Sequence, residues 1–112
     1  MAKVGRFVTD PKVGAHCQIT LDSGEKIVVN HNKGGFKGGH LTIEQTKMMG
    51  LSSTRLFDCD LDSPAGKAAL GQLTKDKRPD SVDATPLGAF VEYVRHAGSV
   101  GDLKARCASL MQ

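Results

Sequence analysis

The chain has 112 residues, enough for one hydrophobic core and too few for two, so we expect a single domain spanning residues 1–112. Charged residues make up 24% and hydrophobic residues 39% of the chain, which excludes an intrinsically disordered composition. The net charge of +3 comes from residues 1–50, where seven Lys and Arg outnumber four Asp and Glu. No segment approaches the roughly 18 apolar residues of a membrane span, and no apolar run of signal-peptide length follows the first residues, so we expect a cytoplasmic protein without a membrane partner.

The first third of the chain predicts β-strands. Residues 5–10 form a short β-prone run that Pro11 ends. Residues 17–21 alternate apolar and polar side chains, and residues 26–31 can return as their antiparallel partner. The polar residues 22–25 between them include Gly24 and predict the turn of a hairpin.

The middle of the chain is less regular. Residues 40–45 are ambiguous, because Leu41 and Ile43 alternate as in a strand while Thr42 and Gln45 fit a helical capping box. We favour a short helix over residues 45–49, ended by Gly50. Residues 55–61 then alternate again and predict a strand.

The second half predicts helices, each opened by a hydroxyl residue or an acid that can cap it. The first begins near Ser63 and runs to about Thr74, although Gly66 and Gly71 each cost it up to about 1 kcal/mol relative to Ala. A polar connection over residues 75–84 follows. Thr85 and Pro86 open a second, amphipathic helix, and Ser99 opens a third. The predicted fold is α+β, a small antiparallel sheet or part-open barrel with two or three C-terminal helices on one face.

The segment over residues 31–40, at the end of the third predicted strand, departs furthest from average composition. Its glycines allow backbone conformations closed to other residues and bring amide groups close to a ligand, while its lysines supply positive charge. Phe36 adds one aromatic ring that can anchor a partner or stack on a base. We assign partner binding to this segment, which holds His31, Lys33, Gly34, Gly35, Phe36, Lys37, Gly38, Gly39 and His40. The simpler alternative is a surface connection with no ligand.

No catalytic, cofactor or metal site is predicted. The glycine spacing matches neither a Walker loop nor a dinucleotide fingerprint. Asp58, Asp60 and Asp62 lie at alternate positions but lack the other ligands of a calcium loop, so we interpret them as an exposed strand face leading into a helix. His31 and His40 could meet across the neck of the glycine-rich segment, yet two histidines are an incomplete metal site, and solvated histidines are the simpler interpretation.

The three cysteines are well separated and form no C-x-x-C pair, which favours buried free thiols. Three classes of function stay open. We favour a non-catalytic accessory module that binds a protein through residues 31–40. The first alternative is a nucleic-acid-binding protein that contacts phosphates through the surface from Lys26 to Lys47. The second alternative is a small enzyme, which we favour least. The sequence identifies neither the partner nor the oligomeric state.

Overall fold

The computed structural model describes residues 2–10, 14–33, 38–47, 50–76, 78 and 85–112. Its strands form one antiparallel sheet in the order β1-β3-β4-β5-β6, with β2 also paired to β3. The strands are β1 (Lys3–Val4), β2 (Val8–Asp10), β3 (Gly14–Thr20), β4 (Lys26–Asn32), β5 (His40–Lys47) and β6 (Ser52–Asp60). Within the described residues the sheet stays open, since β6 pairs only with β5. The predicted α+β class is therefore confirmed, as an open sheet and not a closed barrel.

The β3–β4 hairpin is confirmed where the sequence places it. Cys17 and Ile19 are fully buried on β3, whereas Gln18 between them is exposed, as a period of two requires. The turn closes through a hydrogen bond from the Leu21 N–H to the Glu25 carbonyl, and Gly24 adopts a φ of +91°. That positive φ is the conformation for which glycine is suited.

Three predictions in the sheet need correction. Residues 40–47 form strand β5, and no helix begins there; Met48 and Met49 lie outside the described residues. This segment is a strand and not a helix because β5 pairs with β4 on one side and with β6 on the other, which buries Leu41 and Ile43. Of the predicted run 5–10, only Val8–Asp10 forms a strand, β2, whereas β1 (Lys3–Val4) lies before the run. Strand β6 begins at Ser52, earlier than predicted.

The helices begin where the sequence predicts. They are α1 (Pro64–Thr74), α2 (Pro86–Val94) and α3 (Val100–Leu110). Ser63, Thr85 and Ser99 each accept a hydrogen bond from the backbone N–H three residues later, which satisfies one of the free donors of the first turn. None of the helices in the described part of the chain is both long and apolar enough to cross a membrane.

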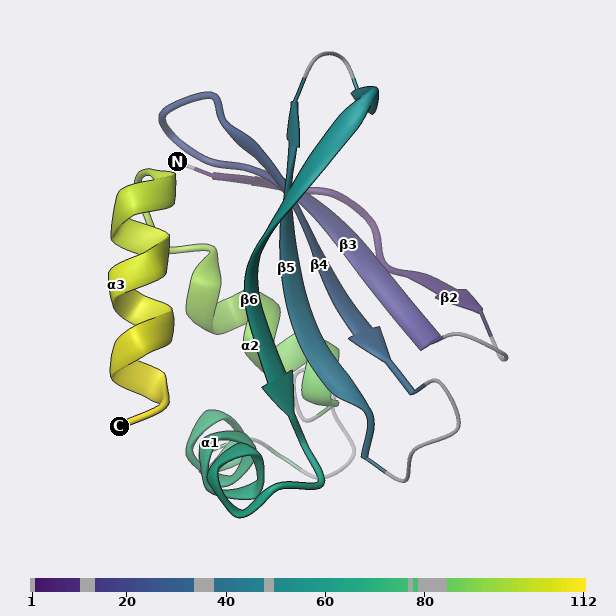
Figure 1. The fold of residues 1–112 in the computed structure, drawn as a ribbon, viewed down its shortest axis with the longest axis vertical. Coiled ribbons are helices and arrows are strands. Elements are labelled where there is room, and N and C mark those ends of the chain that lie inside the picture. Colours follow the sequence, from purple (N-terminus) through teal and green to yellow (C-terminus); the bar gives the residue numbers. More distant parts are fainter. Residues whose placement is uncertain (1, 11–13, 34–37, 48–49, 77, 79–84) are drawn as a thin grey trace.

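The core lies between the helices and one face of the sheet (Figure 1). Helix α2 contacts β3, β4 and β5, while α1 and α3 both contact β6. Phe90 of α2 is fully buried, and its ring lies 5.6 Å from the ring of Phe57 on β6, measured between centroids. The opposite face of the sheet carries mainly polar side chains.

Candidate functional site

The structure describes part of the predicted binding segment. His31, Lys33, Gly38, Gly39 and His40 are placed at the ends of β4 and β5. Gly34, Gly35, Phe36 and Lys37 lie outside the described residues. The site can therefore be built from the neck of the segment, where the chain leaves β4 and enters β5.

The neck is fixed by hydrogen bonds to three separate elements. His31 Nε2 lies 2.8 Å from the Gly38 carbonyl oxygen, so it carries the proton and donates, because a carbonyl only accepts. The Gly38 N–H donates to Asp62 Oδ1 at 2.8 Å. The Leu61 N–H donates to the Gly39 carbonyl at 2.9 Å. These contacts join β4, β5 and the turn before α1, and hold the neck in one position.

Glycine is required at position 39. Gly39 has a φ of +77°, and a Cβ there would stand 2.5 Å from the Asn32 carbonyl oxygen. A side chain would thus be strained by the backbone conformation and would also collide with the end of β4. The glycine at this position is part of the neck's geometry, which composition alone does not reveal.

His31 and His40 do not come together. His31 is opposite Leu41 in the β4–β5 register and is buried on the core face, whereas His40 is opposite Asn32. The interpretation of both as solvated histidines is wrong for His31. Among the described residues, no group of three or more His, Cys, Asp or Glu side chains could hold a metal ion.

His40 belongs to a row of charged groups on the polar face of the sheet. Its Nδ1 lies 2.7 Å from Asp58 Oδ1, and Arg55 joins Asp58 to Glu44 through contacts of 3.4 and 3.1 Å. The hydrogen bond with Asp58 raises the pKa of His40 above its ordinary value. Arg55 and Asp58 can meet because a register shift at Ile43 and Glu44 inserts an extra residue into β6.

The side chains of Asp58, Asp60 and Asp62 do not converge on one site, because each has different partners. Asp58 pairs with His40 and Arg55, Asp60 Oδ1 accepts from the Asp62 N–H, and Asp62 fixes Gly38. The exposed positions of Asp58 and Asp60 agree with the predicted strand face leading into α1. The role of Asp62 in holding the neck was not predicted, since it depends on two segments 24 residues apart.

A groove opens at the same end of the sheet, and sequence reasoning missed it. The cavity has a volume of about 470 Å³. It is lined by Phe7, Thr9, Asp10, Gly14, Ala15, His31, Lys33, Thr85, Pro86 and Leu87. Phe7 and its neighbour Val8 keep 38% and 42% of their surface exposed, and with Leu51 they are the large apolar side chains exposed among the described residues. The only sequence signal was the β-prone run 5–10, because the groove forms from segments far apart in the chain.

The lysines of the alternative nucleic-acid surface are divided between two ends of the sheet. Lys26 begins β4 and Lys47 ends β5 beside it, whereas Lys33 follows the far end of β4. Figure 1 shows the ends of β4 and β5 that flank residues 33–39 at the opposite end of the sheet from the β3–β4 turn. Strand β4 runs for seven residues from Lys26 to Asn32, so Lys33 lies roughly 20 Å from Lys26.

Comparison with known proteins gives no match, whether to a family model, a curated protein or a solved structure.

Proposed function

We propose that this protein is a non-catalytic binding module that contacts a protein partner through residues 31–40 and the adjoining groove. The observation that carries the proposal is the meeting of a fixed loop neck and an apolar groove at one end of the sheet. A fixed neck lowers the conformational-entropy cost of binding, because this part of the segment is already ordered before the partner binds. Exposed aromatic and aliphatic side chains beside a cavity are the usual anchors of a protein interface.

The groove favours a partner segment with an apolar side chain near an acidic one. Phe7, Pro86 and Leu87 supply apolar surface, and Lys33 is exposed at the edge. Asp10, which also lines the groove, already has an interaction within the protein. The apolar side chain would enter the groove and a carboxylate would approach Lys33. We place this function in the cytoplasm, in keeping with the free cysteines Cys17, Cys59 and Cys107.

A protein partner is preferred to nucleic acid because of the separation of the lysines. Phosphate binding along a duplex or a single strand uses basic side chains that share one face or groove. In the described residues, Lys26 and Lys47 are remote from Lys33 and from the groove. Lys37 lies outside the described residues.

The proposal can be tested by capturing the partner from extracts of the source cell on immobilised protein. We expect Phe7→Ala and Phe36→Ala each to reduce capture strongly, because each removes an apolar anchor, with Lys33→Ala/Lys37→Ala reducing it less. Leu51→Ala is the matched apolar control, since Leu51 is 85% exposed at the other end of the sheet. Lys26→Ala/Lys47→Ala is the matched charge control. Thermal melts of all variants should resemble wild type.

The salt dependence distinguishes the two kinds of partner. A protein held by apolar contacts should stay bound after nuclease treatment and change little between low and moderate salt. Nucleic acid should be released by nuclease, and its affinity should fall steeply with salt, with a shallower slope in Lys33→Ala/Lys37→Ala. Equal capture by the groove variants and by Leu51→Ala would overturn the proposal.

A further inference from the structure

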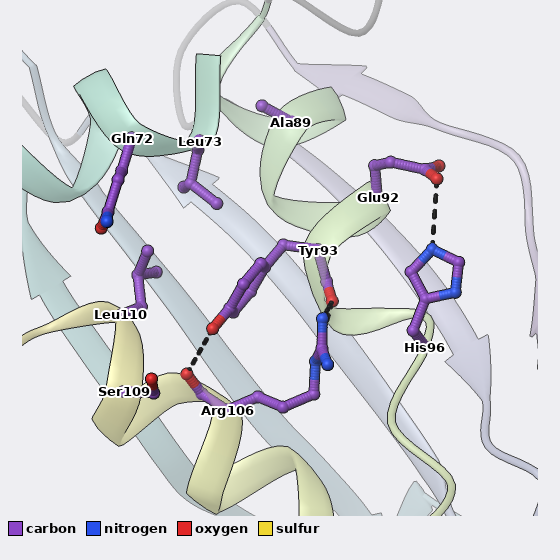
Figure 2. Close-up of a pocket in the computed structure, with 9 residues that line it drawn as sticks. All are labelled: Gln72, Leu73, Ala89, Glu92, Tyr93, His96, Arg106, Ser109 and Leu110. Atoms are coloured by element: carbon purple, nitrogen blue, oxygen red, sulfur yellow. Dashed lines mark hydrogen bonds and ion pairs between the residues drawn. The ribbon is translucent and has the colours of Figure 1, made fainter. Parts of the chain in front are cut away.

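A second cavity lies between the three helices (Figure 2). It shares no lining residue with the groove at the loop end, the end of the sheet that carries residues 31–40. Its volume is about 440 Å³, within the range of small-molecule sites. Leu73 of α1, Ala89 of α2 and Leu110 of α3 form an apolar floor, each less than a tenth exposed. Gln72 and Ser109, both exposed, stand at the opening.

Arg106 of α3 is held at this cavity in a fixed orientation. Its Nε and Nη2 both donate to the Tyr93 carbonyl oxygen, at 3.2 and 3.0 Å. Its guanidinium carbon lies 4.6 Å from the centroid of the Tyr93 ring, and the Tyr93 hydroxyl donates back to the Arg106 carbonyl at 2.7 Å. Figure 2 shows the two side chains running in opposite directions between α2 and α3, each reaching the backbone of the other residue. Binding would therefore cost Arg106 little further loss of rotamer freedom.

The charge of Arg106 has no counter-ion in the described part of the chain. No described carboxylate lies within ion-pair distance of its guanidinium, and Nη1 makes no hydrogen bond there. Glu92, the carboxylate that lines the same cavity, is engaged by Arg95 at 3.5 Å and by His96 at 3.3 Å. The cavity thus combines an apolar floor with an unneutralised, half-buried guanidinium.

We propose that this cavity binds a small organic monocarboxylate with an apolar tail. The carboxylate accepts hydrogen bonds from Arg106, whose planar donor group suits carboxylate oxygens. The tail covers Leu73, Ala89 and Leu110 and packs against the Tyr93 ring. A neutral molecule of the same shape gains the apolar contacts alone, and a dianion meets only one free positive group.

Octanoate is a suitable probe, with octanol as its neutral counterpart, and binding is followed by NMR shifts of the Leu73 and Leu110 methyl groups. We expect saturable octanoate binding with a dissociation constant on the order of 1 mM or tighter. Wild-type protein should bind octanol about tenfold or more weakly than octanoate, because octanol lacks the carboxylate that forms the charge-assisted hydrogen bond. The Arg106→Gln variant should bind octanoate about tenfold or more weakly than wild type does, for the same reason. Lys104→Gln, which removes one exposed charge from α3 outside the cavity, should bind octanoate as wild type does.

A second variant tests the location without touching Arg106. Ser109 is exposed at the opening, so Ser109→Trp should fill the cavity while keeping the core intact, and octanoate binding should be abolished. The inference is overturned if octanol binds as tightly as octanoate, or if Ser109→Trp leaves octanoate binding unchanged. Should Arg106→Gln fail to fold, these two comparisons decide the question. None of these outcomes depends on the partner of the loop end.

Discussion

At the scale of single residues, the clearest electrostatic feature is the His40–Asp58 pair. Both side chains are partly exposed, at 31% and 41%, so solvent screens their attraction and the pair contributes little to stability. The pair nevertheless shifts the pKa of His40 upward. Hydrogen bonding to Asp58 raises the pKa of His40, and the charges of Asp60 and Asp62 act in the same direction.

We expect Asp58→Asn to lower the pKa of His40 toward its ordinary value of 6.5. Since the folded-state pKa is raised, the small stabilisation of the folded state by this pair is fully present below pH 6.5. It is lost as pH rises through the folded-state pKa of His40. NMR titration of the His40 ring protons measures the shift directly. Asp60→Asn is the control and should move the pKa less. A His40 pKa unchanged by Asp58→Asn would contradict the assigned pairing.

The cysteines are buried free thiols, as the sequence predicts. Cys17, Cys59 and Cys107 lie in the core, and burial raises the pKa of all three thiols, that of Cys107 to about 11. Because the thiolate is the reactive form, we expect native protein near pH 8 to react negligibly with a thiol reagent such as Ellman's reagent. In denaturant all three thiols should react. Rapid labelling of one thiol in the native state would contradict this burial.

At the scale of elements, the local sequence pattern was enough to predict those elements whose structure is decided by their own residues. The 17–31 hairpin and the three helix starts follow from alternation, a turn glycine and side-chain caps. Strand β5 could not be predicted in the same way, because Thr42 and Gln45 satisfy a helical pattern locally. Pairing with strands on both sides outweighs that pattern, and pairing partners are not visible in the segment itself.

The two glycines of α1 differ in a way that the sequence does not show. A Cβ at Gly66 would stand only 1.8 Å from the Asp60 carbonyl oxygen, whereas nothing lies within 4 Å of one at Gly71. We expect Gly66→Ala to destabilise the protein by about 1–3 kcal/mol through overpacking. Gly71→Ala should stabilise it by about 0.5–1 kcal/mol, because Ala is the better helix former. Urea unfolding of both variants measures the difference, and the same sign for both would contradict the packing of α1 on the end of β6.

At the scale of the whole molecule, one aromatic contact links the helical layer to the sheet. Phe90 is fully buried against Phe57. Phe90→Ala should cost about 3–5 kcal/mol by leaving a cavity, a large part of the stability of a small domain. Denaturant melts provide the measurement, and Leu51→Ala should change stability by less than about 0.5 kcal/mol. A cost below about 1 kcal/mol for Phe90→Ala would show that α2 does not pack on the sheet in this way.

The candidate site was predicted in part. Composition made residues 31–40 a candidate, because glycine, lysine and histidine are concentrated there, and their role in binding stays a prediction. The neck contacts of Asp62 and the groove beside Phe7 depend on register and on the packing of α2, which join segments far apart in the chain. The same holds for the cavity at Arg106, whose walls come from three helices. Such sites follow from tertiary arrangement and leave no local pattern.

We propose that the loop end of the sheet is the surface that meets a partner. Photo-crosslinking in the source cell tests it most directly, with p-benzoylphenylalanine placed singly at position 36, at position 7 and, as control, at position 51. Leu51 is highly exposed at the opposite end of the sheet, so it reports chance encounters. We predict one discrete adduct of higher mass from positions 36 and 7, resistant to nuclease, and none from position 51. Adducts of equal yield from position 51, or none from positions 36 and 7, would contradict the account.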